Sequence, residues 1–129
     1  TRFQVSGTAT AAGAYDFVLL KRSTANTGGT SSTPAVVPHD SSDAAGTAVV
    51  KAYTANPTTG TLVGNVRAVK GTVTTSAGAI PNVPTTQLFG EGEGKEIVLR
   101  GTAQSLCLNL NGATIAGGSL NIDIEWTEE

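Results

Sequence analysis

The residue types that support catalysis gather in one short run, His39-Asp40-Ser41-Ser42-Asp43. Histidine, serine and aspartate form the triad of many hydrolases, in which the imidazole takes the proton of the serine hydroxyl. A triad joins residues that a rigid scaffold brings together, whereas these five are neighbours in a stretch rich in turn-forming residues. The short side chains of Asp40 and Ser41 hydrogen-bond readily to nearby backbone groups. The run therefore favours a turn in a loop over a catalytic site.

A second run, Gly90-Glu91-Gly92-Glu93-Gly94-Lys95, superficially resembles a phosphate-binding loop. The Walker pattern requires Ser or Thr after the lysine, where Glu96 stands, and two glutamates would repel a phosphate. The acids of both runs offer oxygen ligands to Ca²⁺, but neither set has the spacing of a calcium-binding loop. We therefore predict a hairpin turn at residues 90–95, and neither a metal nor a cofactor.

The remaining reactive or stacking side chains are explained by packing. Cys107 is the only cysteine, so the chain cannot form an internal disulfide, and no Cys/His group has zinc spacing. No base is placed near Cys107 by the sequence, which favours a small packing residue over a nucleophile. Trp126 is in phase with apolar neighbours, which favours core or interface packing over sugar stacking. A basic stripe with interleaved aromatics is lacking, and we predict no enzymatic activity, no nucleic-acid partner and no small-molecule ligand.

The composition predicts an all-β protein. At 129 residues the chain has the length of one domain, which we place at residues 1–129. Charged residues make up only 14% and glycine numbers 16, and serine and threonine are frequent. This mixture favours short strands joined by tight turns, and no window has a sustained apolar period near 3.6.

Two strands are predicted near the C-terminus, at residues 106–110 and 120–126. In each, apolar residues alternate with polar or small ones, as Leu108 does with Asn109 and Ile124 with Glu125. Successive strand side chains point to opposite faces, so each strand has one apolar and one polar face. This is typical of an antiparallel sheet with one face on a core. We expect Trp126 to lie on the apolar face.

Other strands follow from shorter patterns and turn signals. They are predicted at residues 2–5, 15–20, 36–37, 48–53, 62–73, 87–89 and 96–100. Both faces of 15–20 are largely apolar, which indicates a strand covered on both sides. Gly64 and Gly71 are expected to mark bulges or corners. The fold predicted is a single antiparallel β-sandwich or jelly roll of about seven to eight strands.

One long loop, rich in Ser, Thr and Gly, is predicted at residues 23–46. A loop of this length is usually functional, disordered, or ordered by a neighbouring molecule. The chain has no apolar stretch long enough to span a membrane and no signal-like start, so we expect no membrane partner. A domain without disulfides suits a reducing compartment such as the cytosol.

Four runs of the sequence resemble small structural proteins of tailed bacteriophages: KRSTANTGG (21–29), VPHDS (37–41), AYTANP (52–57) and GGSLNIDIEWTE (117–128). The resemblance implies a virion component made in the cytoplasm of the bacterial host, and it carries over no catalytic residue. A small β-sandwich suits a head decoration, or cement, protein on the capsid surface. The partners implied are the major capsid protein and copies of the chain itself, in a homotrimer.

The partner-contacting residues are expected among the polar side chains of the N-terminal strand, the long loop and the outward faces of the C-terminal strands. They are Arg2, Lys21, Arg22, Asn26, His39, Asp40, Asn109, Asn121, Asp123 and Glu125. Two other functions remain open at this stage. One is a receptor- or glycan-binding module of a fibre or spike, and the other is a ring subunit of a tail or connector.

Overall fold

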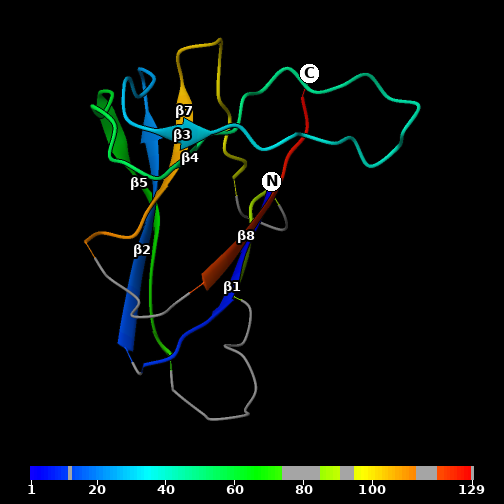
Figure 1. Cartoon of the computed structure of the whole chain (residues 1–129). Helices are drawn as coiled ribbons and strands as arrows, with labels where there is room; N and C mark the ends of the chain where they lie inside the picture. The colour runs from blue at the N-terminus through cyan, green and yellow to red at the C-terminus, as the bar shows by residue number, and fades with distance from the viewer. Residues whose placement is uncertain (12, 74–84, 91–94, 113–118, 129) are drawn as a thin grey trace.

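The computed structural model describes the chain except for residues 12, 74–84, 91–94, 113–118 and 129 (Figure 1). It is all-β: the described part contains no helix, and all its strand pairs are antiparallel. The strands are β1 (Arg2–Thr8), β2 (Gly13–Arg22), β3 (Ser31–Ser32), β4 (Ala52–Tyr53), β5 (Leu62–Val73), β6 (Thr85–Leu88), β7 (Ser105–Asn109) and β8 (Ser119–Glu125).

The first sheet has the order β6-β1-β8, so the N-terminal strand lies between two strands from the C-terminal half. Phe3 pairs with Ile124 and Val5 with Ile122. Phe3 and Val5 are both 2% exposed. The predicted alternation holds here, since the side chains of Asn121 and the other polar residues of β8 fall on the opposite face.

The second sheet has the order β5-β2-β7, with β2 in the centre. Four consecutive residues of β2, from Phe17 to Leu20, are buried. Because neighbouring side chains point to opposite faces, both faces of β2 must be covered. The prediction of a strand covered on both sides is therefore confirmed.

The two sheets meet through the ring pair Phe3 and Phe17. The ring centroids lie 6.5 Å apart at an interplanar angle of 75°, an edge-to-face contact between β1 and β2. Leu108, Leu120 and Ile124 are among the apolar residues packed around this pair. The leucine and isoleucine faces predicted for the C-terminal strands thus contribute to the core, although Ile122 remains 50% exposed. Closure of these sheets into a sandwich or jelly roll stays a prediction.

The strand β5 is irregular where it passes the end of β2. Its pairing with β2 shifts register between Leu19 and Leu20, and again between Lys21 and Arg22. Gly64 lies between the two shifts, as predicted for a bulge site. Gly71 instead pairs regularly with Tyr15, so the predicted irregularity there is wrong.

Three predicted strands differ from the structure. Val36 and Val37 lie outside any strand, and of residues 48–53 only Ala52 and Tyr53 form one, β4. Residues 96–100 form no strand and pair with no described strand. Periodicity marks apolar segments that can form strands, but pairing requires a partner edge that the sequence pattern does not reveal. The predicted turn at residues 90–95 falls largely outside the described residues.

The loop predicted at residues 23–46 divides into two parts. Its first part is fixed against the segment before β5: Thr27 and Thr58 exchange backbone hydrogen bonds of 2.8 and 2.9 Å. Gly60 is the close contact of this junction, since a Cβ there would clash with the carbonyl oxygen of Thr24. Its second part leaves the body after β3. The projecting segment continues past residue 46 as far as β4, so it comprises residues 33–51.

Candidate interaction surfaces

Residues 33–51, named the arm, extend away from both three-stranded sheets (Figure 1). The arm begins and ends at the two-residue hairpin β3–β4, where Ser32 pairs with Ala52. Among its residues one backbone–backbone hydrogen bond forms, at the tip, so most of its peptide groups face solvent. Val37 is 75% and Val49 70% exposed. An extended segment with uncovered valines and unpaired backbone is suited to being covered by another surface.

The tip of the arm is a preformed acidic turn. The N–H of Asp43 donates to the carbonyl of Asp40 over 3.0 Å, which closes a four-residue turn. The Asp40 carboxylate accepts from the hydroxyl and the N–H of Ser42, at 2.5 and 2.8 Å. These bonds, that of the hydroxyl first, lower the pKa of Asp40. The predicted Asx-type turn is confirmed, and the carboxylate of Asp40 is engaged in holding it.

The returning leg of the arm is fastened by the C-terminal tail. One oxygen of Glu128 accepts from the N–H and the hydroxyl of Thr47, both at 2.7 Å, and the other accepts from the N–H of Ala48 and the indole N–H of Trp126. These donors, Trp126 first and then Thr47 and Ala48, lower the pKa of Glu128 to about 2. A carboxylate with several donors forms a fixed clamp because the charged form is the one that is hydrogen-bonded.

Glu128→Gln should release this clamp, because a neutral amide accepts hydrogen bonds more weakly than a carboxylate. We expect faster hydrogen exchange at the amides of Thr47 and Ala48, with exchange in the strands unchanged. The matched control is Glu125→Gln, which alters an acid of β8 that pairs with Arg2. Equal protection of Thr47 in Glu128→Gln and the wild type would show that the clamp does not form.

The same clamp has a defined pH range. Folding lowers the pKa of Glu128, so its contribution is complete above the ordinary value near 4.5 and is lost as the pH falls through about 2. The carboxyl carbon shift of Glu128 in an NMR titration should have its midpoint near the lower value. A midpoint near 4.5 would contradict the clamp.

A groove of about 410 Å³ lies between the two three-stranded sheets, beside β2, β5 and β6. Its apolar wall is formed by Val66, Leu88, Phe89, Ile97 and Val98. Its described charged residues are three cations and one acid: Lys21, Arg67, Lys95 and Glu96. The excess of positive charge beside an apolar wall suits an acidic segment that also carries aliphatic side chains.

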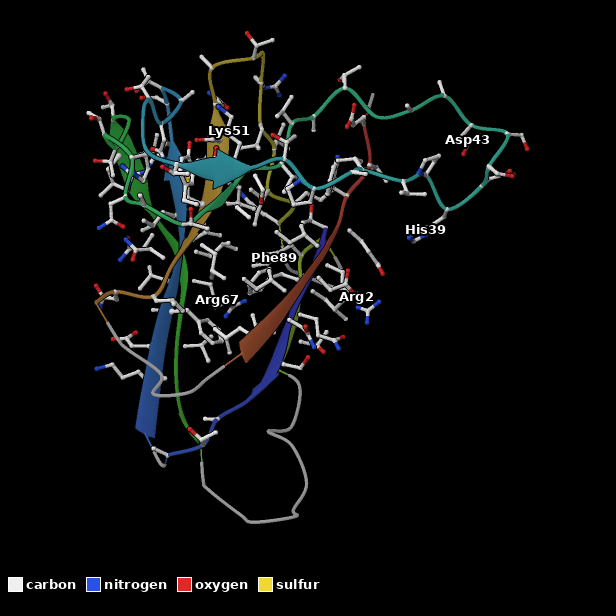
Figure 2. The ribbon with its side chains drawn as sticks, viewed as in Figure 1. Arg2, His39, Asp43, Lys51, Arg67 and Phe89 are labelled. Atoms are coloured by element: carbon white, nitrogen blue, oxygen red, sulfur yellow. The ribbon has the colours of Figure 1, made fainter. Side chains whose placement is uncertain are left out.

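Arg67 is the groove cation that stacks on an aromatic ring. Its guanidinium carbon lies 5.6 Å from the ring centroid of Phe89, a cation–π contact, and the two side chains face each other in Figure 2. No described residue forms an ion pair or hydrogen bond with the guanidinium of Arg67. Lys21, by contrast, donates to the carbonyl of Val98 over 2.6 Å, so it holds the wall of the groove.

The residues predicted to contact a partner fall in three separate places. On the outer face of the first sheet, the guanidinium of Arg2 lies 2.8 Å from the carboxylate of Glu125, and Asn121 and Asp123 are exposed along the same strand. His39 lies at the tip of the arm (Figure 2), and both His39 and Asp40 are exposed. The remaining four belong to the second sheet and its adjoining turn: Lys21, Arg22, Asn26 and Asn109.

The side chains of two of these residues bind other parts of the same chain. Arg22 is 8% exposed and donates to the carbonyl of Gly60 over 2.6 Å. Asn26 accepts from the N–H of Gly60 over 2.9 Å, and its amide nitrogen lies 3.9 Å from the sulfur of Cys107. Both side chains fix the junction at the base of the hairpin β3–β4. Cys107 is half-buried there, in agreement with its prediction as a packing residue.

The sequence pattern missed Glu128, Arg67 and Phe89. Each depends on contacts between distant segments: Glu128 meets Thr47 across 81 positions of the chain. A charged residue near the C-terminus gives no local signal of such a partner. For the arm, the signal in the sequence was the Ser-, Thr- and Gly-rich composition of residues 23–46.

The described residues contain no group of three or more His, Cys, Asp or Glu side chains placed to hold a metal ion. They also contain no helix long and apolar enough to cross a membrane. Comparison of the chain with protein-family models, curated proteins and solved structures finds no match.

Proposed function

We propose that this chain is a non-enzymatic structural protein of a tailed bacteriophage that binds the outer surface of the capsid as a homo-oligomer and stabilises it. The partners are the major capsid protein and copies of the chain itself, in a trimer folded as a β-sandwich. The protein is made in the host cytoplasm and resides on the virion. The observation that carries the proposal is the arm, an extended segment whose exposed valines and free peptide groups lack a covering surface.

The energetics favour a partner for the arm. Full burial of one valine side chain contributes about 1.5–3 kcal/mol, from which the cost of ordering the contact surfaces is subtracted. Val37 and Val49 together therefore suffice only for a weak contact. A lattice of linked copies converts weak contacts into stable attachment, because each bound neighbour raises the effective concentration of the next. This is the mechanism by which many copies bridge adjacent capsid subunits and oppose internal pressure.

The proposal is tested by adding the purified chain to capsids that lack it and imaging them by electron cryomicroscopy. We expect regular density over the whole lattice, with the arm at the capsid or at a neighbouring copy. A ring subunit of a tail or connector would instead occupy one ring per particle. Capsids without added density at saturating protein would refute the proposal.

The alternative of a glycan- or receptor-binding module receives less support. Such a module presents an exposed aromatic ring beside a few polar groups. Trp126, Tyr53 and Phe89 are each half-buried, and the indole N–H of Trp126 is engaged by Glu128. Phe89 lies beneath Arg67. The described aromatic side chains therefore offer no fully exposed platform for a sugar.

A further inference from the structure

The groove and the arm tip complement each other in charge and in apolar character. The described charged residues of the groove are Lys21, Arg67, Lys95 and Glu96, beside an apolar wall that includes Phe89. The tip carries two carboxylates, Asp40 and Asp43, and the leg that leads to it carries Val37, 75% exposed. The groove offers positive charge and an apolar wall, and the arm offers negative charge and an exposed aliphatic side chain.

The acidic turn already has a fixed conformation before any such contact forms. Its backbone hydrogen bond and the two bonds to Ser42 fix its shape, so little conformational freedom remains to be lost on binding. Asp40 is used in the turn itself. The Asp43 carboxylate has no hydrogen bond or ion pair to a described residue, and it is exposed at the end of the arm (Figure 2). Asp43 is thus the free charge of the tip.

The groove of the same chain is not within reach of the tip. The arm runs to one side of the body, so His39 and Asp43 at its tip lie well away from Arg67 and Phe89 (Figure 2), and its returning leg is held at Thr47 and Ala48 by Glu128. From Thr33 to the start of the turn at Asp40 the arm spans up to about 23 Å at ~3.3 Å per residue. This reach takes the acidic turn beyond the surface of its own chain, where only another molecule can meet it.

We infer that the acidic turn of one copy binds in the groove of a second copy, with Asp43 beside Arg67 and Lys95, and Val37 against Leu88 and Val98. The contact joins two different surfaces, so successive copies repeat it head to tail and a closed ring satisfies every arm and every groove. This inference deepens the proposed function and rests on its homo-oligomer, but it does not depend on the capsid.

The test exchanges the two charges between copies. Asp43→Arg and Arg67→Asp each replace an attraction by a like-charge contact, and each should weaken self-association about tenfold or more in analytical ultracentrifugation. A mixture of the two variants should associate again, because Asp43 of one meets Arg67 of the other and the reversed pair is also complementary. Recovery on mixing is specific to a contact between molecules.

Matched variants separate this result from a damaged fold. Lys51→Asp makes the same charge change at the base of the arm, outside the groove, and should leave association unchanged. Lys95→Asp alters the groove without touching the stack of Arg67 on Phe89, and should weaken association. The urea midpoint of each variant reports on folding.

The outcomes distinguish the inference from the proposed function. Wild-type protein that is monomeric at all concentrations, or association that no groove variant weakens, would overturn the inference, even if the chain decorates capsids. Charge-sensitive association of a chain that binds no capsid would support the inference and refute the capsid role. Two single variants that fail to associate when mixed would also overturn it.

Discussion

Phe3→Ala should destabilise the fold by about 3–5 kcal/mol, the usual range for removing a buried aromatic ring. Phe3 is 2% exposed and contacts Phe17 edge to face, so the substitution leaves a cavity where the two sheets meet. Such a loss is a large share of the ~5–15 kcal/mol by which domains are stable. Urea unfolding followed by Trp126 fluorescence measures it.

A double-mutant cycle isolates the ring pair itself. We expect the loss of stability in the double variant Phe3→Ala with Phe17→Ala to differ from the sum of the two single losses. The difference, which is the coupling energy of the ring pair, should be about 0.5–1.5 kcal/mol. Val37→Ala, at an arm side chain that is 75% exposed, is the matched control and should change stability by less than about 0.5 kcal/mol. A cost below about 1 kcal/mol for Phe3→Ala would contradict a core shared by the two sheets.

Replacing the arm by a two-residue turn should abolish binding to capsids and to other copies while the fold persists. Ser32 and Ala52 face each other in the hairpin β3–β4, so Asn-Gly can join them directly in place of residues 33–51. The shortened chain loses the Glu128 clamp but no contact of the core. We expect an unfolding midpoint near that of the wild type and no measurable capsid binding.

The control for this replacement keeps the arm but changes its valines. Val37→Ser with Val49→Ser removes apolar surface and leaves the length of the arm and its acidic turn unchanged. We expect intermediate binding, because only part of the contact is lost. Full binding by the chain without its arm would show that another surface, such as the outer face of β1 and β8, makes the attachment.

The strands were predictable from the sequence where the pattern is local. The period of two around Phe3 and Ile124, and the doubly apolar run 17–20, each specify a strand and the face that it buries. The strand predicted at residues 96–100 failed because its pairing depends on an edge supplied by distant residues. The two-residue strand β3 escapes detection for another reason: Ser31 and Ser32 carry no periodic signal.

The interaction surfaces were only partly predictable. The polar run at 39–43 indicated a turn, and its hydrogen bonds span no more than three residues, so local chemistry sufficed. The groove brings together β2, β5, β6 and the segment after it, and no single stretch contains more than part of it. Arg22 was predicted on an outward face, yet the fold buries it, because burial depends on the fold and not on residue type.

The irregular register of β5 affects how readily the protein aggregates. Within the described part of the chain, β5 pairs on one side only, and an open strand edge can template fibrils when many copies are crowded together. The two shifts around Gly64 interrupt the row of hydrogen-bonding groups that an incoming strand would need, and Arg67 and Lys70 add like charges. The bulged edge thus protects a crowded protein from precipitating, at the cost of leaving Leu62 and Val63 exposed.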